Sequence, residues 1–132
     1  MPYAFRRDGS DLMSAWEWTA DAAATLRDSH GGRVIVTGDL NATAQKGSPY
    51  RNPRFTRMLE EGWLRSQPVG VGSYFSPKGA VNEIDHVLAT SSCEIASARY
   101  VTQVDGFVLA AAAKDALSDH AALVFAIACS LE

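Results

Sequence analysis

Hydrophobic residues recur at helical spacing in the first quarter of the chain. They follow the three-and-four spacing of a single helix face and are Leu12, Trp16, Ala20, Ala23, Ala24 and Leu26. Ser10 or Asp11 can cap the start of such a helix, because a side-chain oxygen there accepts hydrogen bonds from unpaired backbone N–H groups. The pattern stops at His30-Gly31-Gly32. We therefore predict a helix that runs to about residue 28 after a polar, irregular N-terminal segment.

Short apolar runs bounded by turn residues predict the strands. The clearest is Val34-Ile35-Val36, within residues 33–37 and closed by Gly38. A run of this kind is typical of a short strand buried on both faces. Further strands are predicted over residues 73–75, 84–89, 95–104 and 121–129.

Two other segments complete the predicted elements. Phe55, Met58 and Leu59 predict a short helix that ends at Gly62. Residues 107–113 fit either a short helix or a loop. Strands interleaved with two helices indicate an α/β or α+β fold with a mixed sheet.

Composition and charge narrow the class of protein. The 132 residues suffice for one domain, and 47% hydrophobic against 20% charged residues exclude a disordered or collagen-like chain. The net charge of −3 supplies no global basic field, so any nucleic-acid binding would need a local site. No apolar run approaches the ~20 residues of a membrane span. Arg6, Arg7 and Asp8 interrupt any apolar signal segment, so the localisation stays unknown.

The two cysteines, Cys93 and Cys129, form neither a disulfide framework nor a metal-site spacing. We interpret them as reduced thiols in or near strands, with a single bridge between them as the alternative.

Three short polar clusters lie at the ends of predicted strands. They are Gly38-Asp39-Leu40-Asn41, Glu83-Ile84-Asp85-His86 and Leu117-Ser118-Asp119-His120. Each has a plain structural interpretation when taken alone: a strand-ending turn, a solvent-facing aspartate, and a capped turn with a surface histidine. In the first cluster, the alternation of an extended segment predicts that Asp39 and Asn41 point the same way.

Taken together, the clusters favour a catalytic site. Layered proteins gather strand ends at one edge, and each cluster supplies an aspartate. His120 is the candidate general base, Asp85 orients it, Asp119 is the candidate metal ligand and Asn41 is a hydrogen-bond donor. Such a group suits attack of water on a phosphate, with a divalent cation neutralising charge. Oxygen ligands favour Mg²⁺ or Mn²⁺ over Zn²⁺.

The three motifs, in this order and spacing, resemble the C-terminal motifs of the endonuclease/exonuclease/phosphatase (DNase I-like) superfamily. The resemblance covers residues 12–127. It implies a nuclease-like, Mg²⁺-dependent hydrolase acting on phosphate ester bonds. It also implies the fold: half of a four-layer α/β sandwich, a mixed β-sheet with helices on one face. DNA, RNA, phosphoinositide and phospholipid hydrolases share these motifs, so the substrate stays open.

Residue roles follow from the same resemblance. Asp39 and Asn41 match the pair that contacts the phosphate and positions the attacking water. Asp85 matches the carboxylate that orients the catalytic histidine, and Asp119 matches a metal-associated carboxylate. His120 matches the histidine that acts as general base or binds the scissile phosphate.

The chain matches only the second half of the superfamily domain, which is built from two similar halves. The asparagine-bearing strand, the main metal-binding glutamate and the mid-domain His or Tyr motif have no counterpart, and Glu83 stands where a basic residue is common. We therefore interpret residues 1–132 as a single partial domain, the C-terminal half, with Leu131-Glu132 as a tag remnant. We expect weak binding of Mg²⁺ or Mn²⁺ and an incomplete site.

Two functional hypotheses follow. The first is a metal-dependent phosphoesterase whose partners are a phosphate-ester substrate, such as a nucleic acid, and the missing N-terminal half. The second is a non-catalytic binding or structural module. In both, the sheet face that lacks its partner predicts a homo-oligomer, because exposed apolar surface drives association.

Overall fold

The computed structural model describes residues 10–30 and 32–130, with side chains from residue 15 onward. The predicted irregular N-terminal segment and Leu131-Glu132, interpreted as a tag remnant, lie outside the described residues.

The two predicted helices are confirmed. Helix α1 spans Ser10–Ser29. Helix α2 spans Pro53–Glu60, and Asn52 caps it by accepting a hydrogen bond from the Arg54 amide at 2.8 Å. Proline at the first helical position costs no hydrogen bond, because that N–H has no partner within a helix. The sequence Asn-Pro therefore sets the start of α2.

Nine strands occur in the described part of the chain. They are β1 (Ile35–Asp39), β2 (Leu64–Arg65), β3 (Tyr74–Phe75), β4 (Val81–Asn82), β5 (Asp85–Ala89), β6 (Cys93–Val101), β7 (Gln103–Val104), β8 (Phe107–Val108) and β9 (Ala122–Cys129). The largest sheet has the order β1-β5-β2, and β3-β4, β6-β9 and β7-β8 form pairs. All these ladders are antiparallel, and parallel pairing occurs at isolated bridges such as Val69–Arg99. The segment 107–113, left open by the sequence, begins as strand β8.

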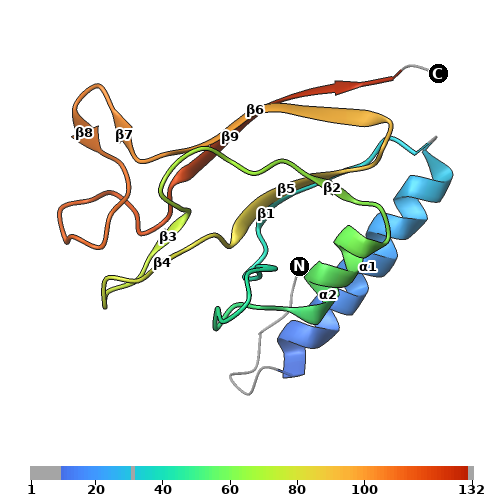
Figure 1. Ribbon diagram of the computed structural model, residues 1–132, viewed down its shortest axis with the longest axis horizontal. Coiled ribbons are helices and arrows are strands. Elements are labelled where there is room, and N and C mark those ends of the chain that lie inside the picture. Colours follow the sequence, from blue (N-terminus) through green and yellow to red (C-terminus); the bar gives the residue numbers. More distant parts are fainter. Residues whose placement is uncertain (1–9, 31, 131–132) are drawn as a thin grey trace.

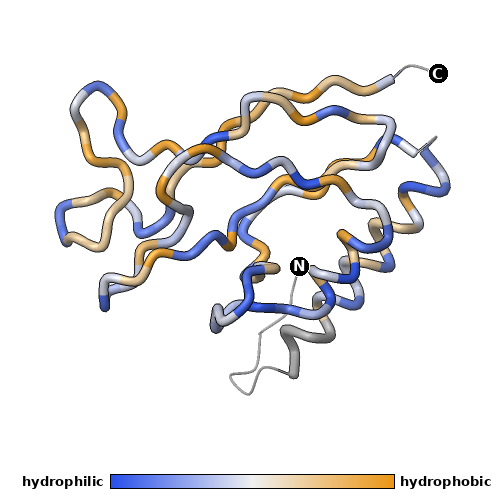
Figure 2. Tube along the Cα trace, in the orientation of Figure 1, coloured by the Kyte–Doolittle hydropathy of each residue, from blue (hydrophilic) through white to orange (hydrophobic). Residues whose placement is uncertain are grey.

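The main core lies between the two helices and the β1-β5-β2 sheet. Figure 1 shows both helices on the same side of that sheet. The buried cluster there combines Trp16 and Ala23 of α1, Phe55 and Met58 of α2, and Leu88 of β5. Figure 2 shows hydrophobic positions running along β5, β6 and β9, whereas the loop from β1 to α2 is largely hydrophilic. The fold class is α+β, with helices on one face of the central sheet; its place as half of a four-layer sandwich stays a prediction.

The prediction that the first strand is buried on both faces is wrong. Val34 is buried, but Ile35 is 39% exposed and most of β1 lies at the surface. The reason is its position, because β1 is an edge of the three-stranded sheet while β5 occupies the centre. The strand that is buried along most of its length is β5, where Val87, Leu88 and Ala89 are fully buried.

The interpretation of the cysteines as reduced thiols is also wrong. Cys93 and Cys129 form a disulfide. They are directly opposite each other in the β6-β9 ladder, with Cα atoms 4.0 Å apart. Facing positions in an antiparallel pair bring side chains close enough to bond. The bridge therefore joins the start of β6 to the end of β9.

No helix in the described part of the chain is long and apolar enough to cross a membrane.

Candidate active site

Two aspartates face each other at the end of the β1-β5 ladder. The register pairs Asp39 with Asp85, one step beyond the pair Gly38–His86. Residues directly opposite in a sheet present their side chains on the same face. Gly38 has φ 137°, a conformation that side chains rarely adopt, so glycine is needed just before Asp39. The ladder itself thus brings two of the three sequence clusters together.

The third cluster reaches the same place through β3. The amide of Phe75 donates to the carbonyl of Asp119 at 2.8 Å, and the amide of Ala121 donates to the carbonyl of Ser73 at 2.8 Å. These bonds hold His120 opposite Tyr74, with which it forms an antiparallel bridge. His120 is therefore positioned by a backbone pairing just before β9 begins.

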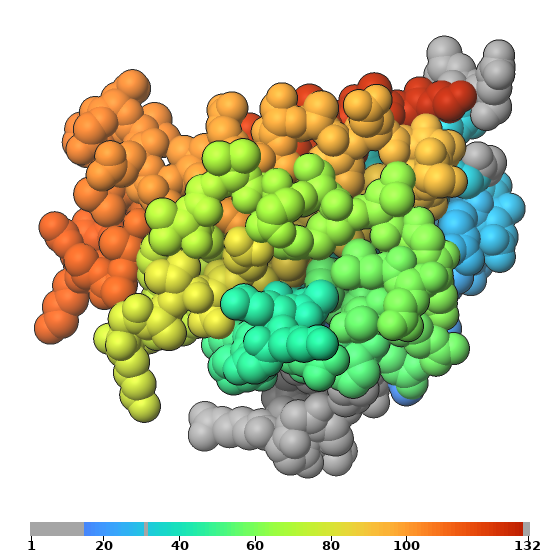
Figure 3. Space-filling model, in the orientation of Figure 1, coloured from blue at the N-terminus to red at the C-terminus, as the bar shows by residue number. Residues whose placement is uncertain are grey.

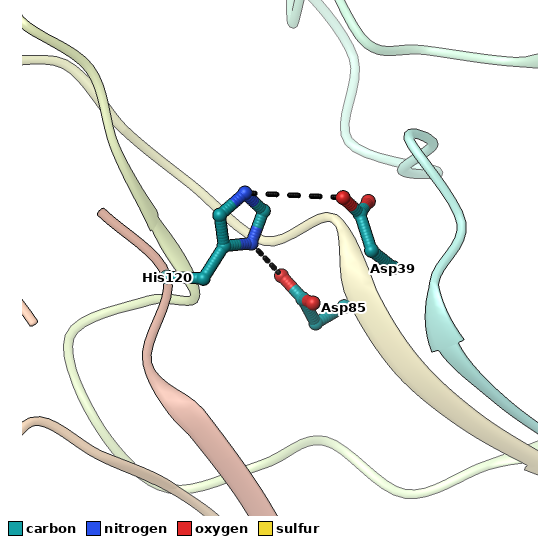
Figure 4. Close-up of side chains that lie close together, drawn as sticks. All are labelled: Asp39, Asp85 and His120. Atoms are coloured by element: carbon teal, nitrogen blue, oxygen red, sulfur yellow. Dashed lines mark hydrogen bonds and ion pairs between the residues drawn. The ribbon is translucent and has the colours of Figure 1, made fainter. Parts of the chain in front are cut away.

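The histidine lies between the two carboxylates (Figure 4). Nδ1 of His120 is 2.9 Å from Oδ2 of Asp85, and Nε2 is 3.8 Å from Oδ2 of Asp39. Asp85 is the more enclosed carboxylate, with its side chain 13% exposed against 40% for Asp39. Since a carboxylate accepts, the short contact places a proton on Nδ1 of neutral His120. Nε2, on the side of Asp39, is then left as an acceptor.

Ser73 connects the elements that carry this pair. Its buried hydroxyl accepts from the amides of Ile84 at 2.8 Å and Asp85 at 3.1 Å, and donates to the carbonyl of Asn82. The backbone carbonyl of Ser73 accepts a hydrogen bond from the backbone N–H of Ala121, the residue after His120. One residue therefore fixes the backbone beside both Asp85 and His120.

The hydroxyl of Tyr100 adds a second support for Asp85. It donates to the backbone carbonyl of Asp85 at 2.7 Å. Burial, followed by the nearby charge of Glu83, raises the pKa of Tyr100 to about 12. The phenol thus stays protonated and remains a donor under all ordinary conditions.

His86 faces away from the site and into the core, as alternation along β5 predicts. It is 1% exposed and stacks on Phe55 with ring centroids 4.5 Å apart. Nδ1 accepts from Nε of Arg65 at 2.9 Å, so Nε2 carries the proton that is shared with the carbonyl of Ala42 at 2.5 Å. His86 therefore ties the loop after Asn41 to the central strand.

The remaining predicted residues lie around the Asp39–Asp85–His120 group. Strand β1 ends at Asp39. Asn41, two residues later, has φ 49°, and its backbone N–H donates a hydrogen bond to Oδ1 of Asp39 at 2.9 Å. The chain turns at Asn41 instead of staying extended, so the alternation from which we predicted that Asp39 and Asn41 point the same way does not apply here. Asp119 is exposed and lies outside the group of side chains that could share a metal ion.

That group could hold a metal ion through two carboxylates and one imidazole. One ligand atom from each of Asp39, Asp85 and His120 lies within 4.8 Å of the others. Oxygen donors suit Mg²⁺ or Mn²⁺. Because Oδ2 of Asp85 already accepts from His120, Asp39 is the carboxylate best placed to hold such an ion.

The site residues that sequence reasoning missed are the supporting ones. Ser73, Arg65 and Tyr100 lie in segments that show only strand or turn signals. The available signal for Ser73 was a serine that follows Gly72 at the start of a predicted strand, which alone does not distinguish a buried hydrogen-bonding residue from a surface turn. Glu83 pairs with Arg65 at 3.1 Å, an ion pair within the chain.

The model of the Endonuclease/Exonuclease/phosphatase family matches residues 4–120. The chain therefore belongs to that family, whose members typically hydrolyse phosphate esters and commonly bind divalent metals. Searches of curated proteins and of solved structures give no match. The matched segment includes all three clusters, and it ends at His120.

Proposed function

We propose that the protein is a metal-dependent phosphoesterase in which His120 activates water for attack on phosphorus. The observation that carries this proposal is the 2.9 Å contact of His120 Nδ1 with Asp85, which leaves Nε2 directed toward Asp39. Family membership supports the reaction class. The paired carboxylate and imidazole supply the means of moving a proton at neutral pH.

In this mechanism, Nε2 of His120 takes a proton from the attacking water. The water oxygen forms a bond to phosphorus, and the bond from phosphorus to the leaving oxygen breaks. The leaving oxygen takes up a proton from solvent, to which the imidazolium of His120 later returns its own. Asp85 stabilises the imidazolium that forms and keeps the ring in one orientation. Asn41, in the turn beside Asp39, is assigned to phosphate contact.

A divalent cation fits the acidic side of this site. Asp39 is the first residue proposed to hold it, and Asp119, next to His120, is proposed to contribute from outside the close group. When bound, the ion would neutralise negative charge on the phosphate, which two nearby carboxylates would otherwise repel. With few protein ligands, we expect Mg²⁺ to bind weakly, as titration calorimetry would measure.

The test is hydrolysis of bis(p-nitrophenyl) phosphate and nicking of plasmid DNA in the presence of Mg²⁺. His120→Ala should lower the rate by about 10²- to 10⁴-fold, the usual contribution of a general base. Asp85→Asn should also lower it, because the amide can present N–H to Nδ1 and favour the wrong tautomer.

His30→Ala is the matched control, because His30 is an exposed histidine at the end of α1. It should retain wild-type activity. Full activity in His120→Ala would contradict the mechanism. A folded wild-type chain without activity would mean that the site is incomplete in this chain, and a non-catalytic binding or structural module would be favoured only if adding the missing N-terminal half also failed to give activity.

A further inference from the structure

Two tyrosines extend the ring of His120 into a row of aromatic side chains. The rings of Tyr74 and His120 have centroids 5.1 Å apart and are tilted by 40°. Tyr50 meets Tyr74 edge to face, with centroids 6.1 Å apart and planes at 80°. We call Tyr50 and Tyr74 the aromatic shelf. It begins in contact with the catalytic histidine.

The shelf is built from two separate segments that the fold places side by side. Tyr74 belongs to β3 and is fixed opposite His120 by their backbone bridge. Tyr50 lies in the loop between β1 and α2, where its carbonyl accepts from Thr43 at 2.9 Å and its amide donates to Ser48. Figure 3 shows this loop (teal) next to the β3–β4 hairpin (yellow) on one face of the molecule.

Packing in the hydrophobic core does not explain the positions of these two tyrosine rings. Both tyrosines are only half-buried, and neither belongs to the two hydrophobic clusters or packs against them. Burial, then the charge and hydroxyl of Tyr74, then the charge of Asp39 raise the pKa of Tyr50. Tyr50 is therefore within electrostatic reach of the acidic side of the site as well as in contact with Tyr74.

We propose that the aromatic shelf binds a planar aromatic ring carried by the phosphate ester whose phosphorus lies at His120. This inference rests on the proposed function and names its substrate class. Partly exposed aromatic side chains next to a phosphate site are the usual platform for a nucleobase or an aryl group. An inositol or alkyl ester offers no flat face to stack.

Charge limits the size of this substrate. The net charge of the chain is −3, and two of its carboxylates, Asp39 and Asp85, lie beside His120 at one end of the shelf. A long nucleic acid needs a basic track for its backbone. The favoured ligand is therefore a nucleotide-sized or aryl phosphate ester rather than a duplex.

The test compares binding of ligands that differ by the ring alone. AMP and ribose 5-phosphate share the sugar and the phosphate, and phenyl phosphate replaces the nucleoside by a simple aryl group. Dissociation constants are measured by titration calorimetry with Mg²⁺ present, for wild type, Tyr74→Leu, Tyr50→Leu and Tyr74→Phe. Phe107→Leu is the control, because Phe107 is 75% exposed on the β7–β8 hairpin.

Wild type should bind AMP roughly 5- to 100-fold more tightly than ribose 5-phosphate, the range for stacking of one base. Tyr74→Leu and Tyr50→Leu should reduce this ratio, whereas Tyr74→Phe and Phe107→Leu should keep it. Phenyl phosphate binding as tightly as AMP would assign the shelf to aryl groups in general, and weaker binding would assign it to nucleobases.

Equal affinity of wild type for AMP and ribose 5-phosphate, or no binding of AMP, would overturn the proposal that the aromatic shelf binds an aromatic ring. Neither result decides the proposed function, which hydrolysis of bis(p-nitrophenyl) phosphate by wild type and His120→Ala tests separately. Circular dichroism of each variant distinguishes loss of the shelf from loss of the fold.

Discussion

At the scale of single residues, two histidines of this protein have opposite surroundings. His120 is 29% exposed beside carboxylates, whereas His86 is almost fully buried among Phe55, Arg65 and the carbonyl of Ala42. Burial dominates at His86 and, together with the charge of Arg65, lowers its pKa from 6.5 to about 4 against the raising effects of Ala42 and Glu83. His86 is therefore a neutral structural group throughout the physiological range.

This difference predicts a loss of stability in acid. The unfolded chain binds a proton at His86 near pH 6.5, but the folded chain binds it only near pH 4. The free energy of unfolding should therefore be fully retained above pH 6.5 and should fall by about 3 kcal/mol as the pH drops through that window.

Urea unfolding of wild type and His86→Gln between pH 4 and 8 measures this effect. The glutamine can still donate to the carbonyl of Ala42 but does not titrate. The variant should have a lower free energy of unfolding than wild type at pH 7, and this difference between the two proteins should become smaller toward pH 4. Parallel pH profiles for the two proteins would contradict the assignment.

At the scale of elements, the β6-β9 pair depends on a cross-link at one end. The disulfide joins residues 36 positions apart in the sequence. Closing a loop of that length should stabilise the fold by about 4 kcal/mol in the chain-entropy account. We predict that dithiothreitol lowers the urea midpoint of the wild type.

Cys93→Ser/Cys129→Ser is the control for this prediction, because it lacks the bridge and should not respond to the reductant. Wild type in dithiothreitol should resemble this double variant. Equal midpoints for oxidised and reduced wild type would show that the ladder alone holds the two strands.

Elements could be predicted from the sequence where local pattern decides them. Helix α2 follows from Asn52-Pro53 and the spacing of Phe55, Met58 and Leu59. The burial of β1 could not, because the run Val34-Ile35-Val36 is equally apolar at the centre and at the edge of a sheet. Strand order is a long-range property, and it made β5 the buried strand instead.

The candidate site shows the same division. Asp39, Asp85 and His120 could be singled out because three clusters that each carry an aspartate lie at the ends of predicted strands in one chain, although each cluster alone is an ordinary turn. Their register across β1 and β5, the buried hydroxyl of Ser73 and the pairing of the cysteines arise only when the strands meet. No spacing along the chain encodes those contacts.

At the scale of the whole molecule, strand β9 is an exposed edge. Its ladder partner is β6, and its eight residues include no charged side chain. Ala122, Val124, Ala126 and Ala128 are exposed along one face. Uncharged edge strands of this length are templates for pairing with another strand. We expect β9 to pair antiparallel with β9 of a second copy of the chain.

Light scattering after size exclusion measures this association. Wild type should elute as a dimer or larger oligomer, and Val124→Lys should shift it toward the monomer, because a lysine on the edge opposes pairing. Val69→Lys is the control, because Val69 is 76% exposed and lies outside β9. This variant should leave the oligomeric state unchanged. A monodisperse wild-type monomer would contradict the expectation.

The register pair Asp39–Asp85 has a consequence for how this protein can evolve. Like charges directly opposite in a sheet destabilise it, by a few tenths to about 1 kcal/mol. Asp39→Asn should therefore raise the melting temperature at low salt while it lowers hydrolysis. Added Mg²⁺ should stabilise wild type more than this variant, since a bound ion favours the folded state.

An unchanged or lower melting temperature in Asp39→Asn would show that the two carboxylates do not oppose each other. If they do, selection for stability alone would favour replacement of Asp39, whereas the proposed reaction requires its carboxylate. The end of this ladder is then a position where thermal robustness and turnover are in conflict. A thermostable relative would have to gain its stability elsewhere.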